Sequence, residues 1–161
     1  MFIRKHFTTE SLVLEASPFN RELAMESYIL DNPSVLALNL KEFNDVTILT
    51  SELTLLNAGS NKKGKTDGRI DILANYDSEY LAIVELKKGM LIRKHFEQLQ
   101  NYLKEKTQIL EKGKKQLGLD LWDESLSGPP KWIGVMIGES IEPELMLTAC
   151  TGSSISNQRT A

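Results

Sequence analysis

The stretch GRIDILANYDSEYLAIVELKKG, residues 68–89, contains two apolar runs joined by a short polar segment, and each run carries one acid. Runs of this composition on either side of a few turn-forming residues are typical of a β-hairpin. If residues 77–79 form a three-residue loop, Asp71 lies opposite Glu85 on the neighbouring strand. Directly opposed side chains point to the same face of a sheet, with Cβ atoms roughly 4.5–5.5 Å apart. The hairpin therefore predicts two neighbouring carboxylates.

The loop length decides this register, because a shift of one residue turns every side chain to the other face of the sheet. A two-residue loop would separate the two acids, and a bulge would shift the pairing by one position. The three-residue loop is favoured because it also creates a row of apolar pairs on the opposite face. These pairs are Ile70 with Leu86, Ile72 with Val84, and Ala74 with Ala82.

Two facing carboxylates repel each other, so a positive charge is expected beside them, and two sources are open. Arg69 and Lys87 share their face and could form a charge cluster with them on a solvated surface. Alternatively, the acids hold a divalent cation, since Mg²⁺ favours one or two carboxylates together with waters and phosphate oxygens. Glu85 and Lys87 are two residues apart on one strand and point the same way, so both could act at one phosphate.

The rest of the chain predicts further helices and strands around this hairpin. Ser17 and Pro18 suit the N-cap and first position of a helix, and Pro33 disfavours its continuation. Apolar residues recur with helical spacing after the hairpin, and Gly113 is a plausible stop. The expected elements are a short strand at 11–16, a helix at 17–31, a strand at 46–56, a loop at 57–67, the hairpin, a helix at 91–111 and a strand at 131–138.

Composition and charge limit the classes of protein to which the chain can belong. The 161 residues are enough for a single domain, with a core at about 17–147 and an atypical tail at 148–161. No apolar run is long enough for a signal peptide or a membrane span, so we expect a soluble, cytoplasmic protein without a membrane partner. One cysteine, Cys150, and two histidines cannot form a Cys/His zinc site, so any metal would be held by oxygen.

The motifs of the hairpin resemble those of a known family of nucleases. Ile70-Asp71, a short hairpin and then Glu85-Leu86-Lys87, between two helices, resemble the PD-(D/E)xK nuclease superfamily, and GRIDIL with VELKKG resembles its NucS-like, RecB-type branch. The resemblance covers roughly residues 21–138, and Ile70 stands where the motif has proline. It implies an α/β, restriction-endonuclease-like core with a mixed central sheet flanked by helices, in the order helix, three strands, helix, strand.

The resemblance also implies roles for the hairpin residues. Asp71 and Glu85 would bind Mg²⁺ or Mn²⁺ with help from the Leu86 carbonyl, and Lys87 would orient or activate the attacking water. In the first helix Glu26 projects from an apolar arc, which matches the first-helix acid of these nucleases, or it is a glutamate at the edge of the arc whose head reaches water. Glu22 is an alternative for the same role.

The second helix carries Gln98, which resembles the family's helix glutamine, although a solvent-facing glutamine fits the pattern as well. His95, on the same flank, is interpreted as a phosphate contact or as plain surface. Basic residues cluster despite the net charge of −3, and they are either phosphate contacts or solvated loops. The expected nucleic-acid contacts are Lys62, Lys63, Lys65, Arg69, Lys88, Arg93, Lys94 and Tyr102.

The sequence therefore predicts a nuclease that hydrolyses DNA phosphodiester bonds with Mg²⁺ or Mn²⁺ and a metal-activated water. The alternative is a module of the same fold that binds nucleic acid without cutting it. The presence of Asp71, Glu85 and Lys87 together favours the enzyme, because binding alone does not require all three. Cutting both strands of a duplex often needs two copies of a nuclease, so a homodimer is one arrangement that the sequence allows.

Overall fold

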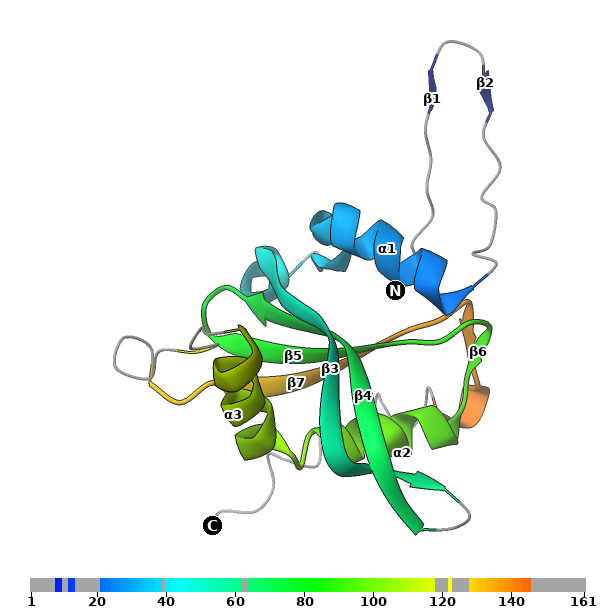
Figure 1. Ribbon diagram of the computed structural model, residues 1–161. Coiled ribbons are helices and arrows are strands. Elements are labelled where there is room, and N and C mark those ends of the chain that lie inside the picture. The colour runs from blue at the N-terminus through cyan, green and yellow to red at the C-terminus, as the bar shows by residue number, and fades with distance from the viewer. Residues whose placement is uncertain are drawn as a thin grey trace, which may run out of the picture.

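A computed structural model describes residues 8–9, 12–13, 21–38, 40–61, 64–117, 122 and 128–145 of the chain. The centre of the described part is a four-stranded sheet with the strand order β3-β4-β5-β7 (Figure 1). Its strands are β3 (Val46–Asn61), β4 (Gly64–Tyr76), β5 (Tyr80–Leu86) and β7 (Lys131–Ile137). The first three are antiparallel, whereas β7 runs parallel to β5. The sheet is therefore mixed, as predicted.

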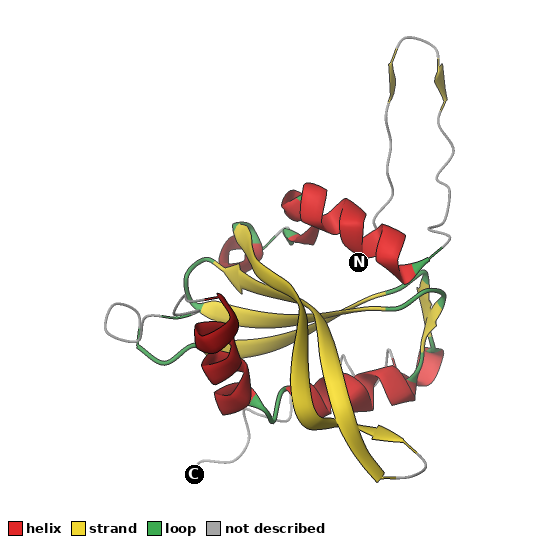
Figure 2. Cartoon of the chain, viewed as in Figure 1, coloured by secondary structure: helices red, strands yellow, loops and turns green. Residues whose placement is uncertain are grey.

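Helices cover both faces of this sheet (Figure 2). The helices are α1 (Glu22–Asp31), α2 (Arg93–Tyr102) and α3 (Lys106–Leu117). Met25 and Ile29 of α1 pack in one apolar cluster with Ile72 and Val84 of the sheet. The other face has its own cluster, in which Leu99, Tyr102 and Ile109 of α2 and α3 meet Leu73 and Ile83. The predicted order of helix, three strands, helix and strand is confirmed.

Short elements complete the described structure. They are β1 (Thr8–Thr9), β2 (Leu12–Val13), the 3₁₀ turns Pro33–Leu36 and Lys41–Phe43, β6 (Met90–Leu91) and β8 (Ser140–Ile141). β1 pairs with β2, in the region where a short strand was expected, and β6 pairs with β8. Among the described residues, no helix has the length and apolar character needed to cross a membrane.

The β4–β5 hairpin has the predicted register. Its loop is residues 77–79, and the paired positions run from Tyr76–Tyr80 to Ile72–Val84. Asp77 and Ser78 adopt positive φ angles of 53° and 56°, a conformation that favours short polar residues at the turn. The side-chain oxygen of Asn75 accepts a hydrogen bond from the Ser78 N–H and closes the loop.

The prediction of a loop at 57–67 is wrong. The β3–β4 ladder continues through this segment to the pair Asn61–Gly64, with a register shift between Leu55 and Gly59. A two-stranded ribbon is held by backbone hydrogen bonds, which every residue type except proline can donate. Apolar alternation, the usual signal of a strand, is missing here, so glycines and polar residues give the appearance of a loop.

The single helix predicted at 91–111 is also wrong, because the chain forms two helices with a turn at residues 103–105. The N–H of Lys104 bonds to the Asn101 carbonyl and the N–H of Glu105 to the Tyr102 carbonyl, a tighter turn than an α-helix makes. The change of direction brings Ile109 back onto the cluster that holds Leu99. Gly113, predicted as the stop, is buried inside α3.

α2 lies close against β7 because glycine occupies position 134. A Cβ at this position would lie 2.7 Å from Cδ2 of Leu99, which real contacts essentially never show. The close packing fixes the height of α2 over the sheet. It thereby fixes the position of the polar side chains that α2 directs toward the ends of β4 and β5.

Candidate active site

Asp71 lies where β4 leaves β5. The β4–β5 ladder ends at Ile72–Val84, while β4 continues alongside β3 with Ile70 opposite Leu53. The predicted pair of Asp71 and Glu85 is thus one position beyond the last pair of the ladder. Oδ2 of Asp71 instead accepts the Leu86 N–H at 2.8 Å, a donor that a continued ladder would direct to the backbone of β4. This bond fixes the carboxylate of Asp71 against the end of β5.

Glu85 and Lys87 project from the end of β5 on the same side, as the spacing predicts. Nζ of Lys87 lies 3.1 Å from Oε2 of Glu85 and 3.9 Å from Oδ2 of Asp71. Glu85 is completely buried, Asp71 is 8% exposed, and the side chain of Lys87 is 15% exposed. Two carboxylates and one ammonium therefore meet away from bulk water, which contradicts a charge cluster on a solvated surface.

Lys87 is held in its charged form at this position. Burial lowers its pKa, but the nearby carboxylates of Glu85 and Asp71 outweigh burial, and the pKa is raised above 10.5. As an ammonium, Lys87 donates hydrogen bonds and accepts none. It is suited to orient an oxygen or to stabilise negative charge on it.

Gln98 and Tyr102, one turn apart on α2, connect Glu85 to β4. Nε2 of Gln98 donates to Oε2 of Glu85 at 3.1 Å and to the Tyr102 hydroxyl at 2.9 Å. The same hydroxyl accepts the N–H of Arg69 at 3.2 Å. Gly68 makes room for the ring, because a Cβ there would lie 2.5 Å from Cε1 of Tyr102. Gln98 is therefore bound into a network with Glu85 rather than free in solvent, and Tyr102, 2% exposed, is a buried link of the same network.

Glu85 is incompletely satisfied by this network. Its Oε1 is buried and has no hydrogen-bond partner among the described residues. Burial, and then the charge of Asp71, raise the pKa of Glu85 to about 7, although Lys87 acts in the opposite direction. A buried carboxylate oxygen without a partner is costly, and a bound cation would satisfy it.

The pKa of Glu85 predicts how the stability of the metal-free protein depends on pH. Between its unfolded pKa of 4.5 and its folded pKa of about 7, the folded protein keeps a proton that the unfolded chain releases. The free energy of unfolding should therefore fall as pH rises through this window. In Glu85→Gln this loss should be absent, which urea unfolding in EDTA at pH 5, 6, 7 and 8 would measure.

The comparison of the two proteins isolates Glu85 from other groups that titrate. The pKa of Glu26 is raised and that of His95 is lowered, and both side chains are present in wild type and variant. Their contributions to the pH dependence therefore cancel in the difference. Parallel stability curves for wild type and Glu85→Gln would contradict a raised pKa at Glu85.

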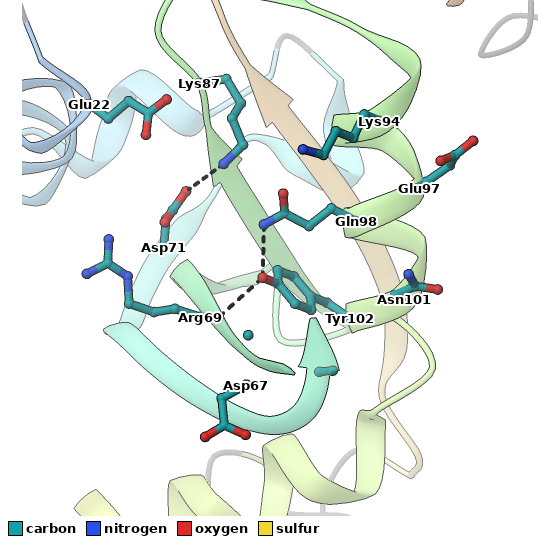
Figure 3. A pocket seen from close by; sticks show the side chains of 12 residues that line it. Glu22, Asp67, Arg69, Asp71, Lys87, Lys94, Glu97, Gln98, Asn101 and Tyr102 are labelled. Carbon is teal, nitrogen blue, oxygen red and sulfur yellow. Dashed lines mark hydrogen bonds and ion pairs between the residues drawn. The ribbon is translucent and has the colours of Figure 1, made fainter. Parts of the chain in front are cut away.

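A pocket of about 420 Å³ opens beside these residues (Figure 3). Asp71 and Lys87 form its inner wall, and α2 contributes a second wall on which Lys94 and Gln98 point inward. The lining residues are Glu22, Ala58, Asp67, Gly68, Arg69, Asp71, Lys87, Lys94, Glu97, Gln98, Asn101 and Tyr102. The pocket is thus lined by charges of both signs, and Asp71 is the one of the two buried hairpin carboxylates that lines it.

The two candidate acids of α1 occupy different places. Glu26 is 6% exposed, and its pKa is raised by burial and then by the charges of Glu52 and Asp71. It does not line the pocket. Glu22 does line the pocket, and its Oε1 accepts the Lys88 N–H at 2.9 Å. Both acids are near the hairpin carboxylates, and Glu26 is the buried one.

The predicted basic residues are distributed unequally around the pocket. Arg69 and Lys94 line it, whereas Lys88 and Arg93 are exposed elsewhere. Lys62 and Lys63 lie outside the described residues, and so does the side chain of Lys65. His95 accepts the Ile92 N–H at 3.4 Å through Nδ1, and burial and the charge of Lys87 lower its pKa.

Sequence reasoning missed Glu52, Asp67, Glu97 and Asn101. Asn101 and Glu97 could have been found, because they follow Lys94 and Gln98 on one flank of a helix at spacings of three and four residues. Asp67 was placed in a loop. Nothing in the sequence singles out Glu52. It occupies an ordinary strand position, and its φ of 55° follows from no local sequence pattern.

The donor groups present fit a divalent cation held by oxygen. Asp71 and Glu85 supply two carboxylates, and one of their oxygens is buried without a partner among the described residues. Mg²⁺ characteristically uses one or two carboxylates and completes its shell with waters and phosphate oxygens. Larger groups of three or more His, Cys, Asp or Glu side chains suited to a metal do not occur in the described ranges.

Comparison with known proteins gives a structural likeness only. No protein-family model matches the chain, and no curated protein matches its sequence. Two solved structures are similar: a complex of EndoMS with double-stranded DNA, at 16% identity, and a repair endonuclease from Pyrococcus abyssi, at 15%, both with a TM-score of 0.39. Each comparison covers 87% of this chain and 47% of the solved chain, so this chain spans about half the length of either.

At a TM-score of 0.39 the two structures support no conclusion about activity. What the site can do must follow from its own side chains.

Proposed function

We propose that this chain hydrolyses phosphodiester bonds of DNA with the help of Mg²⁺ or Mn²⁺. The observation that carries the proposal is the buried carboxylate of Glu85, which has one oxygen without a partner in the described structure and lies beside Asp71 and Lys87. A purely structural ion pair would be expected to satisfy both oxygens, because an unsatisfied buried acceptor destabilises the fold.

The residues of the chain have separable roles in this proposal. Asp71, Glu85 and the Leu86 carbonyl would hold the cation. When bound, a divalent cation polarises phosphate oxygens and offsets the negative charge that develops on them during hydrolysis. Lys87 donates hydrogen bonds from between the two carboxylates and can orient the attacking water or a phosphate oxygen at the pocket. Gln98 holds Glu85 in place, and Tyr102 holds Gln98.

DNA is proposed as the partner because cations stand at the pocket. Arg69 and Lys94 line it, and Lys88 and Arg93 are exposed and free to meet a phosphate backbone. Contacts of this kind supply affinity without reading sequence. The acids Glu22, Asp67 and Glu97 alternate with these cations, so the pocket is not uniformly attractive to a polyanion.

Cleavage of single-stranded, linear duplex and supercoiled DNA in Mg²⁺, Mn²⁺ or EDTA tests the proposal. We expect wild type to cut at least one substrate with Mg²⁺ or Mn²⁺ and none in EDTA, and Asp71→Asn to be inactive. Asp77→Asn is the matched control, because Asp77 is an exposed acid in the loop of the same hairpin and asparagine tolerates its positive φ.

The outcomes separate the nuclease from the alternative module. Wild type that binds DNA but cuts none of the substrates with either cation would support a binding module of the same fold. Wild type that neither binds nor cuts DNA would contradict both functions. Equal activity of Asp71→Asn and Asp77→Asn would remove Asp71 from the mechanism.

A further inference from the structure

Glu52 adopts an unusual backbone conformation in the middle of β3. Its φ angle is 55°, although the residues on either side, Ser51 and Leu53, pair regularly with Ile72 and Ile70 of β4. A positive φ at a residue other than glycine is uncommon and strained, and such residues concentrate at functional sites. The side chain of Glu52 is 51% exposed, so packing of the core does not explain it.

The carboxylate of Glu52 binds Arg69 on the neighbouring strand. Oε1 of Glu52 lies 2.8 Å from NH1 of Arg69, whose side chain is 55% exposed and lines the pocket. In the described structure this is the one hydrogen bond of the guanidinium group. An exposed ion pair contributes little to stability, so the strain at Glu52 is not offset by this contact alone.

The position of Arg69 suits a phosphate group next to the carboxylates. Arg69 is two residues before Asp71 on β4, and its guanidinium extends from the same wall of the pocket (Figure 3). Guanidinium groups bind carboxylate and phosphate oxygens with the same forked geometry. A carboxylate bound to Arg69 therefore occupies the place that a phosphate oxygen would take.

We propose that Arg69 is a subsite for a backbone phosphate of the nucleic acid, and that Glu52 occupies this subsite in the free protein. An incoming strand then has to displace the carboxylate of Glu52 before its phosphate binds Arg69. This inference rests on the proposed function, since it assumes a nucleic-acid substrate at the pocket. It adds a residue that competes with the substrate for Arg69.

The charges around Glu52 support competition rather than assistance. Glu26 lies close enough to Glu52 and Asp71 to be affected by their charges. Burial raises the pKa of Glu26, the carboxylates of Glu52 and Asp71 raise it too, and Arg69 lowers it. Arg69 thus attracts Glu26 in addition to its ion pair with Glu52. Removing the charge of Glu52 frees the arginine and reduces the repulsion of a polyanion.

The test measures binding of a fluorescent single-stranded and duplex oligonucleotide by anisotropy, in EDTA at low salt, where no cleavage occurs. Glu52→Gln should lower Kd about two- to fivefold, the range that loss of an exposed ion pair allows. The matched control is Glu79→Gln, because Glu79 forms a similar exposed pair with Lys131, at 2.7 Å, away from the pocket. The control should bind like wild type.

Two further variants show whether the effect passes through Arg69. Arg69→Gln should bind more weakly than wild type, and Glu52→Gln should improve affinity by less in the Arg69→Gln background than it does in wild type. Glu52→Gly removes the same charge and relieves the positive φ, so it should bind as tightly as Glu52→Gln and melt at a higher temperature than wild type.

Failure of this inference differs from failure of the proposed function. If wild type cleaves DNA but Glu52→Gln and Glu52→Gly bind no more tightly than Glu79→Gln, the competition is disproved and the nuclease stands. If Glu52→Gln binds more weakly than wild type, Glu52 assists binding and the inference is overturned. If neither wild type nor Glu52→Gln binds or cuts any DNA, both proposals fall.

Discussion

Lys87→Met is expected to lower the rate of DNA cleavage about 10²–10⁴-fold, the range for loss of a group that positions or transfers a proton. The ammonium lies 3.1 Å from Glu85 and 3.9 Å from Asp71, so it is a cationic donor beside both carboxylates that would hold the cation. Methionine keeps much of the volume of the side chain and removes the charge. Binding of cation and of DNA should be largely retained. Single-turnover cleavage at saturating cation measures the effect.

The neighbouring residue provides the control for this prediction. Lys88→Met removes the same charge from an exposed side chain, which weakens DNA binding if Lys88 contacts the backbone but should leave the single-turnover rate at saturating protein close to that of wild type. Because Lys87 is the cationic partner of a buried carboxylate, its loss should also lower the melting temperature. The assay therefore has to be run well below the melting temperature of Lys87→Met. A folded Lys87→Met that cleaves like Lys88→Met would exclude Lys87 from the mechanism.

Asp71→Asn should abolish the effect of divalent cations on thermal stability. A ligand that binds only the folded protein stabilises it by RT ln(1 + [L]/Kd), about 2.7 kcal/mol at a concentration of 100 times Kd. The melting temperature of wild type should therefore rise as Mg²⁺ or Mn²⁺ is added, and that of Asp71→Asn should stay constant. The side-chain oxygen of asparagine can still accept the Leu86 N–H, so the local hydrogen bond survives the substitution.

The metal-free proteins provide the second half of this measurement. In EDTA the charge of Asp71 raises the pKa of the buried Glu85, so its removal relieves repulsion. Asp71→Asn should then be as stable as wild type or more stable, by roughly 0.2–1 kcal/mol. Asp77→Asn should respond to cations like wild type. A wild type that is indifferent to cations, together with a destabilised Asp71→Asn, would mean that the acids serve the ion pair with Lys87 and hold no metal.

The group of Asp71, Glu85 and Lys87 could be predicted from the sequence because all three belong to one hairpin. Side chains alternate along a strand, and a turn of known length sets which residues oppose each other. The predicted ladder was two positions too long, since β4 leaves β5 before the pairs Asp71–Glu85 and Ile70–Leu86 form, and Asp71 bonds to the Leu86 N–H instead. That bend depends on the pairing of β4 with β3, which the hairpin sequence does not contain.

Helices and strands with a clear apolar period were predicted well, and those without one were not. The strand at 131–137 and the end of α1 at Asp31 follow from apolar runs and proline signals. The ribbon at 57–61 and 64–67 and the turn at 103–105 do not, because backbone pairing and the docking of Ile109 onto a distant cluster determined them. Neither interaction can be predicted from the local amino-acid composition.

The sequence by itself therefore determined the order of the elements, the register of the hairpin and the identity of the three charged residues at its end. The tertiary structure alone decided that Glu85 is buried with one oxygen unpartnered among the described residues, that Gln98 and Tyr102 hold it, and that Glu52 binds Arg69. The physical reason is the range of the forces. Periodicity and turn geometry act between neighbours in the chain, whereas burial, electrostatic competition and backbone strain arise only when distant segments pack together.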